Sequence, residues 1–161
     1  IKHQCMSMCS GDEVLPSSPE STTWGGRCFC GSVSVKAVGM PTAVSICHCV
    51  ICRKLSGAPF TAQALLKSNQ VTIDTDRELQ AYETSPAVKR YRCPDCLSPI
   101  YASLGRGKMA AVPLTMLEPL DKAEGKGERL SPQHHMYYTQ RIMDVNDDLP
   151  KYCTSSRAGG E

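Results

Sequence analysis

Apolar residues alternate with polar ones in several short stretches of the chain. Val33, Val35 and Ala37 are separated by Ser34 and Lys36, and a period of two residues is typical of a β-strand with one buried face. Turn residues separate further short apolar or β-branched runs, which lie at 43–46, 60–66, 71–73, 79–82, 88–91, 99–102 and 109–112. No stretch shows the 3.6-residue period of a long helix. The pattern therefore predicts one mainly β domain of short strands.

The two ends of the chain differ in composition from this middle part. Residues 1–22 are rich in Ser, Pro and other small polar residues, and residues 154–161 are also small and polar. Such segments lack the apolar side chains that a packed core requires. We therefore expect a disordered leader at 1–22, a folded domain at 23–153 and a flexible tail at 154–161. Cys5 and Cys9 fall in the leader and are excluded as ligands of the folded domain.

Charge and hydropathy give no indication of a nucleic-acid or membrane partner. The 161 residues carry a formal net charge of +2, and the isoelectric point is about 8.1, whereas nucleic-acid-binding domains typically lie above about 9. No apolar run approaches the roughly 18 residues of a membrane helix. The first 16 residues also lack the sustained apolar segment of a signal peptide. We expect a cytoplasmic protein with neither partner, and the sequence leaves a homodimer open.

The chain contains ten cysteines, and seven of them fall into closely spaced clusters. In a secreted protein this number would suggest a disulfide framework, which is the alternative interpretation. The spacings are those of metal-binding knuckles, however, and no export signal is visible. We therefore favour thiolates bound to zinc in a reducing compartment.

The first and last clusters each offer two thiols. Cys28 and Cys30 are two residues apart, so on a strand both sulfurs point to one face. Cys93 and Cys96 form a CxxC knuckle, which presents two thiolates across a tight turn. Together they would complete a closed, tetrahedral structural zinc site. Spacing alone does not fix this pairing, but the number of ligands favours it.

The middle cluster offers three thiols within six residues, at Cys47, Cys49 and Cys52. Three protein ligands leave a fourth position for water or substrate, which is the pattern of a catalytic zinc. The alternative is a second closed site that His48 completes. If this stretch is extended, the His48 side chain points away from its cysteine neighbours, which argues against that alternative.

These motifs, taken together, resemble the family of glutathione-dependent formaldehyde-activating enzymes, which also includes centromere protein V. The order CxC, CxCxxC, CxxC is highly specific in combination, and the resemblance runs from about Trp24 to Tyr152. Its matching segments, of which the last two are weaker, are 26–33, 47–60, 90–96, 132–136 and 147–150. The sequence departs from the family pattern at Leu97, where Gly is usual, and at Arg92, where an aromatic residue is favoured.

The resemblance implies a β-tent fold of packed antiparallel sheets, stapled by one structural and one catalytic Zn²⁺. It implies that the structural zinc is held by Cys28, Cys30, Cys93 and Cys96. It implies that the catalytic zinc is held by Cys47, Cys49 and Cys52. The implied reaction makes or breaks a carbon–sulfur bond between a thiol such as glutathione and a small aldehyde.

Residues around the middle cluster supply the remaining candidates for chemistry. His48 is the candidate acid–base group, although an orienting role is the alternative. Glutathione carries two carboxylates, so basic residues near the open metal position are expected to bind it. We assign His48 and Arg53 to catalysis, and the expected substrate-binding residues are Lys54, Ser56, Gly57 and Arg90.

Two functions from different classes follow from this pattern. The first is a zinc-dependent carbon–sulfur lyase or synthase that acts on a thiol–aldehyde adduct. The second is a non-catalytic zinc module that binds a protein partner, as in centromere protein V. Binding through charge would favour a long basic or proline-rich extension, so the short, nearly neutral leader favours the enzyme. A redox role for the CxxC pair is disfavoured, because the spacing of the other cysteines indicates zinc.

Overall fold

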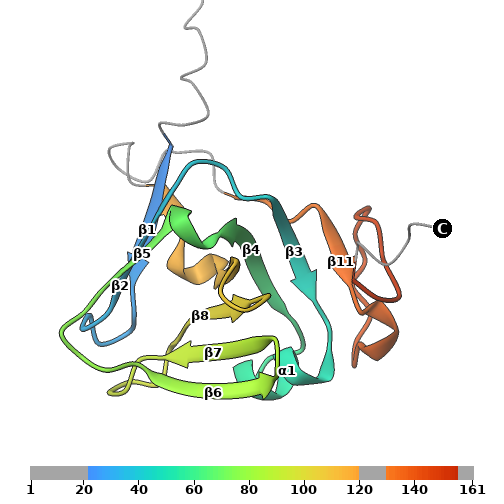
Figure 1. The fold of residues 1–161 in the computed structure, drawn as a ribbon. Helices are drawn as coiled ribbons and strands as arrows, with labels where there is room; N and C mark the ends of the chain where they lie inside the picture. Colours follow the sequence, from blue (N-terminus) through green and yellow to red (C-terminus); the bar gives the residue numbers. More distant parts are fainter. Residues whose placement is uncertain (1–21, 120–129, 156–161) are drawn as a thin grey trace, which may run out of the picture.

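Two β-sheets form the part of the chain that the computed structural model describes, residues 22–119 and 130–155 (Figure 1). The smaller sheet contains β1 (Thr23–Arg27), β2 (Ser34–Val38), β5 (Val71–Asp74) and β10 (Glu118–Pro119). The larger contains β3 (Ala43–Cys47), β4 (Thr61–Lys67), β6 (Gln80–Ser85), β7 (Val88–Arg92), β8 (Pro99–Leu104), β9 (Met109–Pro113) and β11 (His134–Met136). The helical elements are α1 (Val50–Ser56) and the 3₁₀ turns η1 (Ser68–Gln70), η2 (Leu114–Met116) and η4 (Tyr138–Gln140).

The strand order is β10-β1-β2-β5 in the smaller sheet and β11-β3-β4-β9-β8-β7-β6 in the larger one. All neighbouring strands are antiparallel except β11, which runs parallel to β3. The prediction of a mainly β protein is confirmed, and each run of apolar residues singled out above overlaps a strand. Sequence patterning missed β1, β10, β11 and α1. They are short or rich in glycine and histidine, so they carry little periodic signal.

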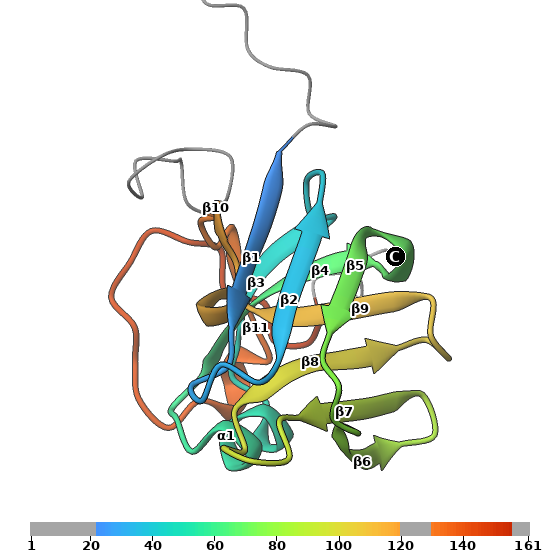
Figure 2. The same ribbon diagram turned by 90° about the vertical axis from the view of Figure 1, so that its left-hand side faces the viewer.

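The hydrophobic core lies between the two sheets, which overlap face to face in Figure 2. Val35 and Ala37 face inward from β2, and the intervening Lys36 is exposed. Leu66 of β4 and Ile100 of β8 belong to the same buried cluster. The alternation seen in the sequence therefore buries one face of each sheet against the other.

The C-terminal segment returns to the middle cysteine cluster. Strand β11 places Met136 beside Cys47, the last residue of β3. Residues 150–152 then pair with β11 in parallel. The His135 N–H donates to the Pro150 carbonyl (2.8 Å), and the Tyr152 N–H donates to the His135 carbonyl (3.0 Å). Residues almost 90 positions apart in the sequence thus become neighbours.

Parts of the sequence-based domain division lie outside the described residues. These are the predicted leader up to residue 21, with Cys5 and Cys9, and the predicted tail from residue 156. Within the described ranges, no helix is long and apolar enough to cross a membrane.

Gly26 allows close packing of β1 against the turn η2. A Cβ atom at this position would lie 3.0 Å from the backbone oxygen of Met116. Backbone cannot yield as a flexible side chain can, so the absence of a side chain is what permits this contact.

Replacing Gly26 with alanine should therefore destabilise the protein. We expect Gly26→Ala to lower the free energy of unfolding by about 1–3 kcal/mol, the usual range for overpacking. Urea unfolding measures this change. The exposed Lys36→Ala on the neighbouring strand is the control, and equal stability of the two variants would contradict the steric explanation.

Candidate metal centres

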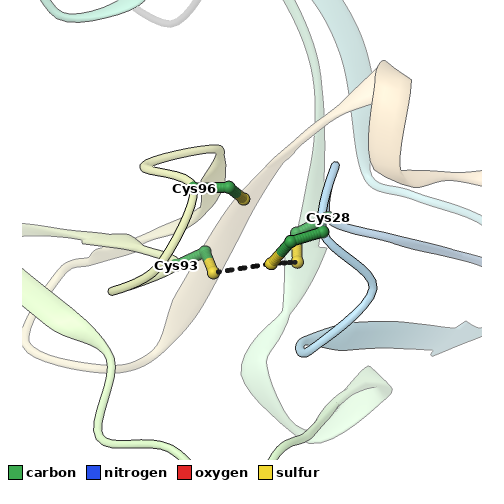
Figure 3. A group of neighbouring side chains, drawn as sticks. Cys28, Cys93 and Cys96 are labelled. Carbon is green, nitrogen blue, oxygen red and sulfur yellow. Dashed lines mark hydrogen bonds between the residues drawn. The ribbon is translucent and has the colours of Figure 1, made fainter.

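Four cysteines from two distant loops converge where the two sheets meet. Cys28 and Cys30 follow β1 of the smaller sheet, whereas Cys93 and Cys96 lie between β7 and β8 of the larger one. All four sulfurs lie within 4.8 Å of one another. Figure 3 shows the sulfur atoms of Cys28, Cys93 and Cys96 facing a common space. Four thiols at such separations are the donor set of a tetrahedral structural zinc.

Hydrogen bonds prepare this cluster to carry negative charge. The Val33 N–H donates to Cys28 Sγ (3.3 Å). Ser98 Oγ accepts the N–H of Phe29 (3.3 Å) and lies 3.2 Å from Cys96 Sγ. Hydrogen bonding between Cys96 and Ser98 lowers the pKa of Cys96 to about 5. A thiolate is the form that binds metal. Through its contacts with Phe29 and Cys96, Ser98 also links the Cys28–Cys30 loop to the Cys93–Cys96 knuckle.

The two departures from the family pattern have structural consequences. Leu97 keeps a left-handed backbone, with φ 60°, at a cost of about 1–2 kcal/mol that glycine would avoid. Arg92 donates from Nη1 to the Leu97 carbonyl (3.0 Å) and from Nη2 to the carbonyl of Leu55 in α1. The arginine thus fastens the last knuckle to the helix that carries part of the middle cluster.

The middle cluster forms where β3 passes into α1. Cys47 ends β3, Cys49 is the N-cap of α1, and Cys52 lies in its first turn. The Cys52 N–H donates to Cys49 Sγ (3.3 Å), which satisfies one of the unpaired amides at the helix start. The helix ends at Gly57, which adopts a left-handed conformation (φ 67°). All three sulfurs lie within 4.8 Å of one another.

Hydrogen bonding within this cluster favours the thiolate form at Cys49. Hydrogen bonds from the thiols of Cys47 and Cys52 lower the pKa of Cys49 to about 2. The shared hydrogen bond with Cys49, together with burial, raises the pKa of Cys47. Arg90 donates from Nη2 to Cys52 Sγ (3.6 Å), and its positive charge contributes to the lowered pKa of Cys49. Three thiols with a cation beside them fit a metal site that keeps one position open.

A cavity of about 560 Å³ adjoins the three cysteines. Its walls come from α1, β4, β6, β7, β8, β9 and the C-terminal segment. The described residues that line it are Cys47, Cys49, Val50, Ile51, Cys52, Gln63, Thr84, Ser85, Val88, Arg90, Ala102, Leu104, Ala111, Met136, Tyr137, Gln140 and Ser155. The buried Arg90 Nε has no hydrogen-bond partner among the described residues. The cavity therefore offers sulfur, one cationic group and apolar surface to a ligand.

The structure brings one of the four expected substrate-binding residues to this cavity, namely Arg90. Lys54 and Gly57 do not line it, and Ser56 lines a neighbouring cavity of only about 50 Å³. Arg53, expected in catalysis, donates from Nε to the His48 carbonyl (3.0 Å). It thereby braces the backbone between two cysteines and does not face the cavity.

The His48 ring also lies away from the cavity, with none of its surface exposed. Its Nε2 lies 2.8 Å from Nδ1 of His135, and Nε2 of His135 lies 2.9 Å from a carboxylate oxygen of Asp147. Lys151 Nζ donates to the same carboxylate (2.8 Å). His48 is not grouped with the three cysteines, which argues against a closed site that His48 would complete.

The direction of the hydrogen bonds in the series His48–His135–Asp147, which we call the histidine relay, follows from the carboxylate of Asp147. Hydrogen bonds from Lys151 and His135 lower the pKa of Asp147 to about 2, so its carboxylate accepts. His135 therefore donates from Nε2 to this carboxylate, and in its singly protonated tautomer Nδ1 accepts from Nε2 of His48. This leaves His48 Nδ1 as a buried acceptor with no partner among the described residues. Burial, together with the nearby His135, lowers the pKa of His48 and keeps it neutral.

Sequence reasoning missed His135 and Asp147 as parts of the site. Both lie in the two weaker segments of the family resemblance, 132–136 and 147–150, and that was the available signal. Cys153 is a free, exposed thiol that belongs to neither cluster.

Comparison with known proteins identifies the same family. The family model described as "Glutathione-dependent formaldehyde-activating enzyme" matches residues 23–140. An uncharacterized lyase of Schizosaccharomyces pombe is 26% identical over 83 residues, which are 52% of this chain and 59% of that protein. The chain thus spans less than two thirds of this relative. A solved structure of a Rhodobacter sphaeroides protein aligns with a TM-score of 0.48 and 19% identity, over 58% of this chain and 86% of that one.

Removing the charge of Asp147 should weaken the hydrogen bonds that link His48, His135 and Asp147. In Asp147→Asn an amide oxygen can still accept from His135, but without the charge that strengthens the hydrogen bond. We expect a lower melting temperature and a shifted ¹⁵N resonance of His135 Nε2, measured by calorimetry and NMR. Asp148→Asn removes a neighbouring exposed charge and serves as the control. If both variants melted together and left the imidazole resonances unchanged, the proposed order of donors would be wrong.

Proposed function

The chain belongs to the glutathione-dependent formaldehyde-activating enzyme family, and on this premise we propose that it is a zinc-dependent carbon–sulfur lyase. Its substrate in this proposal is the adduct of a thiol, such as glutathione, with a small aldehyde. The observation that carries the proposal is the position of the cluster of Cys47, Cys49 and Cys52, which borders a cavity large enough for a small molecule.

The reaction needs no oxidant or further reactant. In the synthetic direction the thiol sulfur bonds to the carbonyl carbon, the C=O double bond becomes a single bond, and the thiol proton ends on the oxygen. Cleavage is the reverse and passes through the same transition state. A zinc ion held by the three thiolates would supply a Lewis acid that favours the thiolate form of a substrate or polarises a carbonyl oxygen.

The residues around the cluster orient it and bind the substrate. We assign Arg90 to an anionic group of the substrate, because this cationic residue lines the cavity beside Cys52. His48 and Arg53 act as positioning residues in this proposal. Arg53 binds the carbonyl of His48, and His135 fixes the ring. Both contacts restrain the backbone between Cys47 and Cys49.

The alternative function is a zinc module that only binds a protein partner. Such a module has no need of an open ligand position, and two closed four-ligand sites would serve it best. The cavity beside a cluster of three thiols therefore favours the enzyme. The four-thiol cluster fits a structural zinc under both functions.

Replacing one thiol of the middle cluster should separate chemistry from folding. We expect the native protein to bind close to two zinc ions per chain and Cys49→Ser close to one, because the four-thiol cluster is unaffected. Turnover of thiol–aldehyde mixtures, followed by NMR, should fall to background while the circular dichroism spectrum persists. Cys153→Ser, which removes an exposed thiol outside both clusters, should keep both zinc ions and full turnover.

Two results would overturn the proposal. One is a native protein with two zinc ions that turns over no adduct of any thiol tested. The other is a Cys49→Ser variant that loses zinc from the middle cluster yet keeps its turnover.

A further inference from the structure

The cavity is larger than the formaldehyde unit and the sulfur of an adduct require. Formaldehyde adds only one carbon and one oxygen to the sulfur of a thiol, whereas cavities of 300–1,000 Å³ accommodate drug-sized ligands. The observed volume is about 560 Å³. Much of this space must therefore hold the substituents of the thiol or of the aldehyde.

Apolar side chains form the wall of the cavity that would contact such substituents. Val88 of β7 and Leu104 of β8 are direct cross-strand neighbours, and both line the cavity. Val50 and Ile51, in the first turn of α1, also line it while keeping 40% and 44% of their surface exposed. Exposed apolar residues gathered at a concave surface mark a binding site for an apolar group.

The polar end of the cavity is defined by Arg90. Among the described residues that line the cavity, the ionisable ones are the three cysteines, Tyr137 and Arg90. Arg90 is the only one of them that carries a permanent positive charge. Nη2 of the guanidinium binds Cys52 Sγ, whereas Nε is buried and unpartnered. An anion that pairs with this guanidinium would lie only a few atoms from a sulfur bound at the cluster.

We propose that the site selects thiols whose carboxylate is one or two carbons from the sulfur and which carry an apolar substituent of several carbons. This inference rests on the lyase function proposed above. The thiol sulfur is directed to the three-cysteine cluster, the carboxylate pairs with Arg90, and the alkyl group lies against Val88 and Leu104. In glutathione both carboxylates lie further from the sulfur and no alkyl chain is present, so glutathione fits these three features less well.

Binding of a graded ligand series tests this selectivity directly. The probes are 2-mercaptoalkanoates from mercaptoacetate to 2-mercaptooctanoate, together with their uncharged amides, titrated calorimetrically into the zinc-loaded protein. Each buried methylene should tighten binding about three- to fourfold. Each carboxylate should bind about 10- to 100-fold more tightly than its amide, as expected for a charge-assisted hydrogen bond.

Matched variants assign the two preferences to residues. Arg90→Gln should abolish the preference for carboxylate over amide. Lys89→Gln removes an exposed charge from the neighbouring position of the same strand and should leave the preference unchanged. Val88→Thr nearly preserves shape but adds a hydroxyl, so it should reduce the gain per methylene. Zinc content and circular dichroism verify that each variant is folded.

The outcomes separate this inference from the lyase function. Affinities that do not depend on chain length or charge would overturn the inference, even if the protein turned over glutathione and formaldehyde. A protein that shows both preferences but joins none of these thiols to an aldehyde would refute the lyase function and leave the selectivity standing. Absence of binding by every probe would also overturn the inference.

Discussion

The four-thiol cluster is the constraint on which the rest of the structure depends. It joins the loop after β1 to the loop between β7 and β8, so it links the two sheets at positions more than 60 residues apart. A metal at this point would contribute its binding free energy directly to folding. The same cluster holds the loop where β7 ends and β8 begins. These two strands carry Arg90, Val88 and Leu104 to the cavity. The position of the cavity walls therefore depends on the four-thiol cluster.

Arg92 extends this constraint to the second cluster. One end of its guanidinium binds the carbonyl of Leu97 in the last knuckle, and the other binds the carbonyl of Leu55 near the end of α1. The last carbonyls of a helix lack partners within the helix, and a cationic donor there also complements the helix dipole. An aromatic residue at this position could not make these two hydrogen bonds. Arg92, which departs from the family pattern, thus links the two cysteine clusters through its two hydrogen bonds.

Local patterns in the sequence predicted local features well and distant pairings poorly. The alternation around Val35 predicted β2 and its buried face. The contact between His48 and His135 depends on the parallel pairing of β11 with β3, which no local pattern encodes. Lys54, Ser56 and Gly57 were assigned to the substrate by their nearness in sequence to Cys52. A seven-residue helix is too short to reveal its period, so their place outside the cavity could not be foreseen.

Unfavourable features gather around the middle cluster. Tyr137, a cavity residue, holds a left-handed backbone (φ 55°), which is strained for an aromatic side chain. Arg90 Nε and His48 Nδ1 are buried without partners among the described residues, and each such group costs about 1–3 kcal/mol. The four-thiol cluster, by contrast, is supported by hydrogen bonds with Val33 and Ser98. Strain of this kind persists only where the surroundings hold it in place, and it concentrates at functional sites. Arg90 lines the cavity, so a ligand anion there would place a negative charge beside this buried cation and offset part of the cost of holding it.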